Sequence, residues 1–238
     1  NMNYISREEI REYLNPVYDL ERLIGRISYR TANPRDLIAF CTSLELLPHI
    51  REILREFHSQ LFKGAAEDMD PLEDLFDLVK RAIVEEPPIT LREGGIIREG
   101  FSQEADEFRK ANTEGKNWLA ELEAREREKT GIKNLKIKYN KVFGYYFEVT
   151  NSFKDMVPDY FIRKQTLTNA ERYTTDELKH LEEVILGAED KLVSLEYDLF
   201  CQVRDQIASQ VVRIQKTARA IALTDVLCSL SLVASRQN

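Results

Sequence analysis

Basic side chains are concentrated between residues 131 and 173. This segment has eight Lys and Arg residues against four Asp and Glu residues, a charge of +4, whereas the rest of the chain has 26 basic and 37 acidic residues, a charge of −11. Lysine and arginine bind the phosphates of nucleic acids. The distribution therefore favours a polyanion as the partner of this segment. The alternative interpretation is that alternating lysines on a strand only solvate its outer face and discourage edge pairing.

Two short motifs inside this segment favour phosphate contact. Asn140 and Lys141 fall at an expected hairpin turn, from which polar side chains project. The run Arg163-Lys164-Gln165-Thr166 leads into Thr168-Asn169, which fits the start of a helix. A helix N-terminus offers unpaired backbone N–H groups and a partial positive charge, both of which suit a phosphate. Asn140 can equally serve turn formation alone, and Thr168 capping alone.

Other site chemistries lack the residues they need. The spacing from Gly95 to Gly100 matches a phosphate-binding loop, but Phe101-Ser102 follows where a Lys and then a Ser or Thr are required. The histidines and cysteines show no metal-ligand spacing, and there is no recognisable Ser/His/Asp set. Acidic pairs such as Glu182-Glu183 fall on polar helical stretches, where we expect them to be solvated. We therefore expect no enzyme activity, no cofactor and no metal in this chain.

The composition is that of a soluble folded chain. Of the 238 residues, 32% are charged and 43% are hydrophobic, and the formal net charge of −7 excludes a uniformly basic nucleic-acid binder. We expect no apolar run to approach the roughly 20 residues that a membrane span needs. The three cysteines, at positions 41, 201 and 228, are far apart, which is typical of a reducing compartment such as the cytoplasm.

Helical periodicity dominates the first 130 residues. The run Asn33-Pro34-Arg35-Asp36 predicts a helix start, because it combines a cap, a proline at the first helical position and an acid that can bond back to the cap. Pro48 predicts a break or restart, and a further helix is expected over residues 49–63, ended by Gly64. Ser102 predicts the start of a charged helix that runs to about residue 130.

The period then changes to that of strands. Leu135–Tyr139 alternates apolar and basic residues, Tyr145–Thr150 is rich in aromatic and β-branched residues, and Phe161–Leu167 fits a third strand. Capping-box patterns at Thr168 and Thr174 then predict helix starts.

One continuous helical pattern follows Glu177. It has no proline and one glycine, Gly187, and its apolar stripe reaches Ile221. An unbroken helix of this length would measure roughly 80–90 Å at about 1.5 Å per residue. We therefore predict a mostly α fold, in which a multi-helical body carries two long protruding helices and a small β-rich domain is inserted at their tip.

Three runs resemble the clamp region of the MutS family of DNA mismatch repair proteins. They are residues 123–132 (EAREREKTGI), 135–146 (LKIKYNKVFGYY) and 160–173 (YFIRKQTLTNAERY). Residues 17–23 and 31–37 resemble the core, or lever, domain of the same family. The resemblance covers essentially the whole chain, and the sequences of these runs are more similar to the bacterial members of the family than to the eukaryotic ones.

The resemblance implies a division into domains and a function. Residues 1–115 and 176–238 would form the core or lever domain, and residues 116–175 the clamp domain inserted between them. The chain would be a non-catalytic fragment of a mismatch repair protein, without the mismatch-reading, connector and ATPase domains of the family. Its clamp would grip the backbone of duplex DNA without sequence specificity, and its lever helices would link the clamp to the ATPase. The alternative is a structural lever module that binds no DNA measurably in isolation.

The resemblance also implies partners and site residues. Double-stranded DNA is the expected partner, with no membrane contact. The parent protein is expected to be a homodimer that binds MutL, uses ATP and Mg²⁺, and works in the bacterial cytoplasm at the nucleoid. The chain itself is expected to hold no cofactor. The expected contacts to the DNA backbone are Asn140, Lys141, Arg163, Lys164, Thr166 and Asn169.

Overall fold

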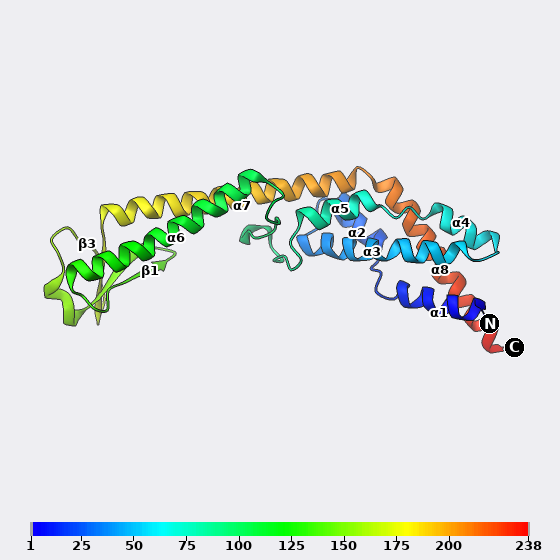
Figure 1. The fold of residues 1–238 in the computed structure, drawn as a ribbon, viewed down its shortest axis with the longest axis horizontal. Coiled ribbons are helices and arrows are strands. Elements are labelled where there is room, and N and C mark those ends of the chain that lie inside the picture. The colour runs from blue at the N-terminus through cyan, green and yellow to red at the C-terminus, as the bar shows by residue number, and fades with distance from the viewer. Residues whose placement is uncertain (1, 238) are drawn as a thin grey trace. The chain divides into compact units, whose positions relative to one another are not determined.

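The computed structural model describes residues 2–237, and the side chains of residues 5–235. The chain forms two compact units: unit 1 comprises Asn1–Phe101 with Glu196–Asn238, and unit 2 comprises Ser102–Leu195. Helices dominate, and one four-stranded sheet lies in unit 2 (Figure 1). The predicted fold class, mostly α with a small β-rich domain, is confirmed. The predicted functional division into residues 1–115, 116–175 and 176–238 concerns roles rather than compactness and stays a prediction.

Unit 1 is a bundle of helices around one apolar core. Its elements are α1 (Met2–Leu14), α2 (Leu20–Ser28), α3 (Pro34–Arg55), α4 (Gln60–Asp68), α5 (Glu73–Ala82), the short 3-10 helix η1 (Leu91–Glu93), the last part of α7 (Asp176–Ala208) and α8 (Val211–Gln237). Among its fully buried side chains are Leu37, Phe40, Leu44, Phe200, Ile207 and Ile214. Helices far apart in the sequence therefore share one core.

The start of α3 is confirmed in atomic detail. Asn33 Oδ1 accepts a hydrogen bond from Asp36 N at 2.9 Å, and Asp36 Oδ2 accepts one from Asn33 N at 2.8 Å. Pro34 occupies the first helical position, where its missing N–H costs nothing. These contacts lie within four residues of each other, which is why the local sequence predicts them.

The break or restart predicted at Pro48 is wrong. α3 continues through Pro48 to Arg55. An interior proline costs a helix about 3 kcal/mol, but Leu47 and Ile50 on either side are fully buried, so core packing offsets that cost. The helix expected over residues 49–63 is accordingly divided between the end of α3 and α4. Gly64 lies within α4 instead of ending a helix.

Unit 2 consists of two helices and the sheet. α6 (Gln103–Thr130) begins as predicted, with Ser102 Oγ accepting from Ala105 N at 3.3 Å. Four antiparallel strands in the order β1-β2-β4-β3 form the sheet. The strands are β1 (Lys136–Asn140), β2 (Gly144–Thr150), β3 (Ile162–Thr166) and β4 (Ala170–Thr174), with the 3-10 helix η2 (Asn151–Met156) after β2. The first three strands confirm the sequence prediction.

The helix start predicted at Thr168-Asn169 is wrong. These residues form the turn between β3 and β4, in which Leu167 N donates to Ala170 O at 2.8 Å. The following residues pair with both β2 and β3, and Tyr173, opposite Phe147, is buried. Strand pairing and burial therefore prevail over the local capping pattern. The second predicted start is one residue early, because Thr175 Oγ1 caps α7 by accepting from Leu178 N at 3.1 Å.

The inner face of the sheet packs against α6 and the first part of α7, which run side by side (Figure 1). The shared core contains Leu119, Leu122, Phe147, Val149, Tyr173, Leu178, Leu181 and Ile185. At Gly115 the two helices approach so closely that an added Cβ would overlap the side chain of Ile185. The glycine thus permits close packing of the two helices that carry the sheet.

The continuous helix predicted after Glu177 is broken once. α7 is uninterrupted through Gly187, but it ends at Ala208, and α8 begins at Val211. Ser209 and Gln210 form a turn in which Gln210 N donates to Ile207 O at 2.9 Å. Ile207 and Ile214, one on each side of the turn, are both fully buried in the core of unit 1. Because Ile207 of α7 and Ile214 of α8 must both reach this core, the chain turns between the two helices.

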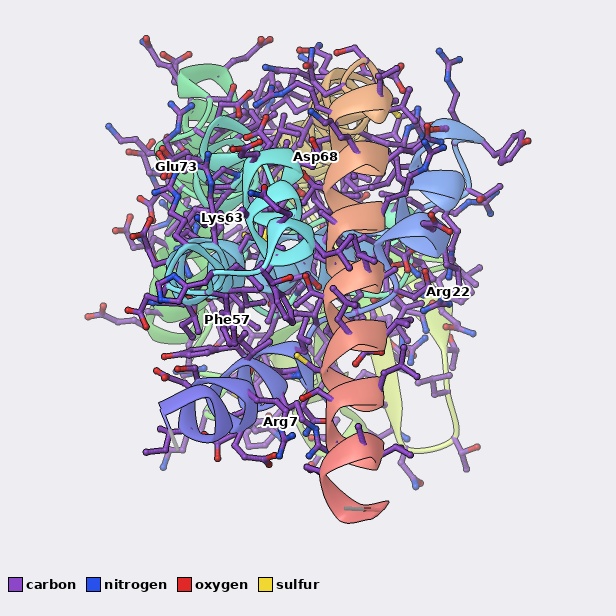
Figure 2. All side chains as sticks on the ribbon, turned by 90° about the vertical axis from the view of Figure 1, so that its right-hand side faces the viewer. Arg7, Arg22, Phe57, Lys63, Asp68 and Glu73 are labelled. Atoms are coloured by element: carbon purple, nitrogen blue, oxygen red, sulfur yellow. The ribbon has the colours of Figure 1, made fainter. Side chains whose placement is uncertain are left out.

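α8 also corrects the expectation about apolar runs. Residues Val211–Ser235 are long and apolar enough, by length and composition, to cross a membrane, and only 28% of their most apolar stretch is buried. In Figure 2, α8 runs along the front of unit 1, beside α4 with Lys63 and Asp68 and close to Arg7 of α1. The core helix of a soluble protein can be equally long and apolar, so length and composition alone are weak evidence for a membrane span.

Glu196 of α7 explains why the glycine segment before α6 is no phosphate loop. Its side chain is fully buried and accepts from Gly95 N at 2.6 Å and from Ile96 N at 3.3 Å. The amides that a phosphate would need are thus occupied by a carboxylate. The same contact joins α7 to the segment that leads into α6.

Replacing Glu196 by Ala is expected to destabilise unit 1 by about 1–3 kcal/mol, because buried N–H groups lose their acceptor. Urea unfolding followed by circular dichroism measures the change, and amide hydrogen exchange at Gly95 and Ile96 is expected to rise at least about tenfold. Asp198→Ala, at an exposed position on the same helix, is the control and should stay within about 0.5 kcal/mol. Unchanged exchange at both amides would contradict this role.

Candidate nucleic-acid interface

The turn between β1 and β2 is built for exposed polar side chains. Asn140 pairs with Gly144 across a three-residue loop, and Asn140 Oδ1 accepts from Val142 N at 2.8 Å. Gly144 has a φ of +71°, the left-handed conformation that closes such loops. Lys141 is exposed beside Val142, which is 82% exposed. The side chain of Asn140 is thus used in the turn through its oxygen, while its amide group can still donate.

Lys164 lies next to this turn. β3 has a register irregularity between Arg163 and Gln165, so Lys164 is left out of the regular pairing. Its Nζ donates to the carbonyl oxygen of Phe143 at 2.9 Å. An ammonium group has three donors, so two remain for another acceptor. The fold therefore brings Asn140, Lys141 and Lys164 together.

The turn is fixed to α7 by an acidic side chain. Tyr145 N donates to a carboxylate oxygen of Glu182. The same carboxylate lies where a Cβ of Gly144 would be. The expectation that Glu182 is merely solvated is therefore incomplete, because this carboxylate positions the basic turn on the helix.

Thr166 and Asn169 lie at the other end of the sheet. β2 separates the two ends by seven residues, or about 20 Å. Both backbone carbonyls of the β3–β4 turn are used: Asn151 N donates to Asn169 O at 3.1 Å, and Asn151 Nδ2 donates to Thr168 O at 3.0 Å. Since no helix begins here, the predicted N-terminal phosphate site is absent, and Asn169 offers only its exposed side chain.

Arg163 is engaged by a buried carboxylate. Glu171, 2% exposed, lies 3.6 Å from Arg163 Nη1 and 3.0 Å from Lys154 Nζ, and it accepts from the Tyr173 hydroxyl. The hydroxyl of Tyr173 and the ammonium of Lys154 hold the pKa of Glu171 below its usual value. Burial, followed by the neighbouring Glu171, raises the pKa of Tyr173 to about 12. This pairing partly neutralises Arg163, unlike Lys141.

The outer face of the sheet carries basic residues that the sequence reasoning did not select. Arg172 stacks on the buried ring of Tyr146 at 4.4 Å and donates from Nη1 to Gln165 Oε1 at 2.8 Å. Its buried Nε has no hydrogen-bond partner among the described residues. Lys138, on the edge strand β1, pairs with Glu148 of β2 at 2.6 Å. The alternation of apolar and basic residues in Leu135–Tyr139 already indicated that Lys138 lies on the outer face of a strand. No pattern indicated this for Arg172, because the residues before it were predicted to start a helix.

Within the described residues, no group of three or more His, Cys, Asp or Glu side chains could hold a metal ion. Fold and site together define a mostly α-helical protein with a basic antiparallel sheet inserted between two long helices. The sequence model of MutS family domain IV matches residues 100–191, nearly the range of unit 2.

Comparison with curated proteins extends the match to nearly the whole chain. The DNA mismatch repair protein MutS of Lachnoclostridium phytofermentans is 65% identical over 99% of this chain and 25% of its own length. MutS of Caldanaerobacter subterraneus is 55% identical over 98% of this chain and 27% of its own length, and that of Acetivibrio thermocellus is 50% identical over 99% and 27%. The chain belongs to the MutS family of DNA mismatch repair proteins and spans about a quarter of the length of these relatives.

Replacing Gly144 by Ala is expected to destabilise unit 2 by at least about 1–2 kcal/mol, because an L-residue is strained at this positive φ and its Cβ would displace Glu182. Urea unfolding followed by the fluorescence of Trp118, the one tryptophan of the chain, reports on unit 2. Gly187→Ala is the matched control: no atom lies within 4 Å of the added Cβ, so α7 should be unchanged or stabilised by up to about 1 kcal/mol. Equal effects of the two substitutions would contradict the account of the turn.

The lowered pKa of Glu171 predicts an acid sensitivity of unit 2. A carboxylate whose pKa is depressed by folding stabilises the fold above its ordinary pKa of 4.5, and this contribution is lost as the pH falls further. Between pH 7 and pH 3, Glu171→Gln is therefore expected to lose less stability than the wild type. Trp118 fluorescence in urea at each pH measures it. Glu128→Gln, which removes an exposed carboxylate of α6, should keep the wild-type profile, and identical profiles for all three proteins would refute the assignment.

Proposed function

We propose that unit 2 is a clamp that grips the backbone of double-stranded DNA without sequence specificity. We further propose that α6 and α7 are lever helices that link this clamp to the ATPase domain of the parent protein. The chain itself is then non-catalytic. The name of its relatives, DNA mismatch repair protein MutS, supports a role of the clamp in mismatch repair.

The observation that carries the proposal is the cluster of Asn140, Lys141 and Lys164 in a segment of charge +4. Two lysines and one amide, held by a hairpin and an edge strand, supply donors to phosphate oxygens. Contacts of this kind position a protein on the duplex but carry no sequence information. A clamp that must act on any stretch of DNA requires this property.

The two ends of the sheet would contact different phosphates. Thr166 and Asn169 lie about 20 Å along β2 from the Asn140 turn. This separation exceeds the width of the major groove, which is about 12 Å. One end can therefore lie on the backbone at one side of a groove while the other end lies on the opposite side. Arg163 contributes less, since Glu171 already pairs with it.

The continuity of α7 supports the lever role. This helix has 33 residues and measures about 50 Å. Its first residues pack under the sheet, whereas Phe200, Val203 and Ile207 are buried in the core of unit 1. The helix thus contributes residues to both units. Glu196 joins the same helix to the segment that precedes α6.

A second candidate is a lever module that binds no DNA measurably in isolation. The net charge of −7 favours it, because the acidic surface repels the duplex. The small number of phosphate contacts also favours it, since affinity falls steeply as contacts are lost.

The remaining proposals concern the parent protein. It would be a homodimer that completes a ring around DNA with two clamps, binds MutL, and uses ATP and Mg²⁺ in a domain outside this chain. It would act in the bacterial cytoplasm at the nucleoid.

Fluorescence anisotropy with labelled duplexes tests the clamp. The chain is expected to bind a fully paired and a mismatched duplex equally, with an affinity that falls as salt rises. Asn140→Ala with Lys164→Ala should weaken binding about tenfold and reduce the salt slope by about 1, because one phosphate contact is lost. Thr166→Ala with Asn169→Ala tests the other end of the sheet.

The matched control removes the same residue types from α6, Lys110→Ala with Asn117→Ala, both exposed. It should leave affinity and salt slope nearly unchanged. Absence of binding by the wild type at about 20 mM salt would favour the lever module. Equal weakening by the control would show that overall charge, and not the Asn140 turn, governs binding.

A further inference from the structure

The outward face of α8 carries a regular apolar stripe. Leu223, Val226, Leu230 and Val233 recur at spacings of three and four residues and are 40–62% exposed. In Figure 2, α8 lies at the front of unit 1. Spacing of this kind is that of a seam against another helix.

The opposite face of α8 is already used. Thr224 and Cys228 are buried in unit 1, and Arg7 of α1 donates from Nη1 to Ser231 Oγ at 3.2 Å and to Ser235 Oγ at 3.3 Å. The apolar stripe is therefore on a side of α8 that unit 1 leaves exposed, and its side chains gain stability only when another surface covers them.

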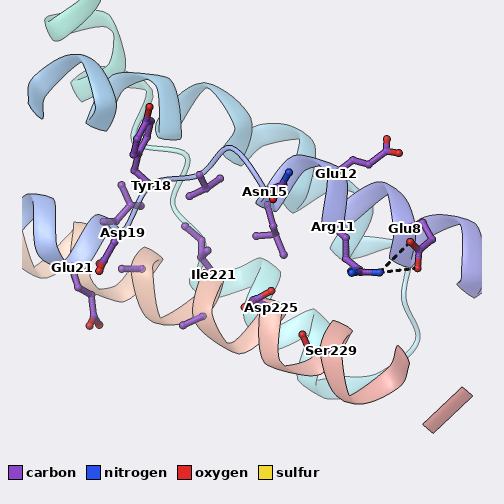
Figure 3. Close-up of a pocket in the computed structure, with 15 residues that line it drawn as sticks. Glu8, Arg11, Glu12, Asn15, Tyr18, Asp19, Glu21, Ile221, Asp225 and Ser229 are labelled. Carbon is purple, nitrogen blue, oxygen red and sulfur yellow. Dashed lines mark hydrogen bonds and ion pairs between the residues drawn. The ribbon is translucent and has the colours of Figure 1, made fainter. Parts of the chain in front are cut away.

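An acidic groove of about 780 Å³ runs beside the stripe, between α8 and the segment from α1 to α2 (Figure 3). Carboxylates dominate its polar lining: Glu8, Glu12, Asp19, Glu21 and Asp225. Arg11 is the one basic residue of the lining, and its Nη1 pairs with Glu8 at 3.2 Å. The groove thus attracts cationic side chains.

We propose that a helix of the parent polypeptide, outside these 238 residues, covers the stripe and the groove together. Its apolar residues would pack on Leu223, Val226 and Leu230, and its Lys or Arg side chains would pair with Asp225. The chain spans only about a quarter of the length of its relatives, so abundant polypeptide is available.

Charge argues against the other occupants. A second copy of the chain would place acidic groove against acidic groove, which repels. A bilayer with anionic lipids would meet the same repulsion, and any bilayer would have to bury the carboxylate of Asp225, which directly precedes Val226. A basic and apolar helix satisfies both features.

Hydroxyl-radical footprinting tests the proposal by comparing the isolated chain with the full-length parent polypeptide. Oxidation of Val226, Leu230 and Val233 is expected to fall at least fivefold in the full-length protein. Val142, 82% exposed in unit 2, is the internal control and should react equally in both. Equal oxidation of the stripe in both proteins would overturn the proposal.

Substitutions separate the apolar and the ionic parts. Val226→Ser with Leu230→Ser should leave the melting temperature of the isolated chain unchanged, since both residues are half exposed, but should lower that of the full-length protein by several degrees. Asp225→Lys should reduce the protection of Leu230 in the full-length protein. Val142→Ser, at a more exposed valine of unit 2, should change neither protein. Equal effects of the stripe substitutions on the isolated chain and the full-length protein would count against the proposal.

Two further measurements test whether a second copy of the chain or a lipid bilayer covers the stripe instead. Sedimentation of the isolated chain would show concentration-dependent dimers, abolished by Leu230→Ser, if a second copy covered the stripe. Flotation with vesicles of phosphatidylcholine, alone or with phosphatidylglycerol, would retain the chain in a Leu230-dependent manner if a bilayer did. Either result would overturn the proposal, and a monomeric chain that does not float supports it.

Discussion

The pairing of β4 between β2 and β3 is the contact on which the rest of unit 2 depends. Tyr173 of β4 lies opposite Phe147 and is buried under α6 and α7. β3 pairs only with β4, so the position of Lys164 relative to the β1–β2 turn depends on this central strand. The proposed phosphate contacts are thus placed by strand pairing, although the residues that form β4 carry a helix-capping pattern.

Acidic residues hold the basic ones in position. Glu182 accepts from the backbone of the β1–β2 turn, Glu171 gathers Lys154 and Arg163, and Glu196 accepts from the segment that precedes α6. Glu171 and Glu196 are buried, and a buried carboxylate is stable only when it is hydrogen-bonded or paired, as both are. Part of the negative charge of the chain is therefore structural. Lys141 and Lys164 themselves stay exposed.

Much of the fold and part of the site could be predicted from local signals. The start of α3 at Asn33, the start of α6 at Ser102 and the first three strands depend on residues within a few positions of each other. Asn140, Lys141 and Lys164 were selected as contacts, and the fold places them together. Arg172 was missed because the residues before it were predicted to start a helix, and the separation of Asn169 from Asn140 required the sheet order.

By itself, the sequence determined the mostly helical class, the cap residues and the basic segment, because capping, periodicity and charge act over three or four residues. Tertiary structure alone decided that α3 passes through Pro48, that residues 209–210 turn and that β4 is a strand. In each case side chains distant in sequence share one core. Burial of Leu47 and Ile214 in the core of unit 1, and of Tyr173 in the core of unit 2, stabilises the fold by about 1.5–3 kcal/mol per side chain. A local preference for a turn or a helix cap is worth only about 1 kcal/mol and is therefore outweighed in most cases.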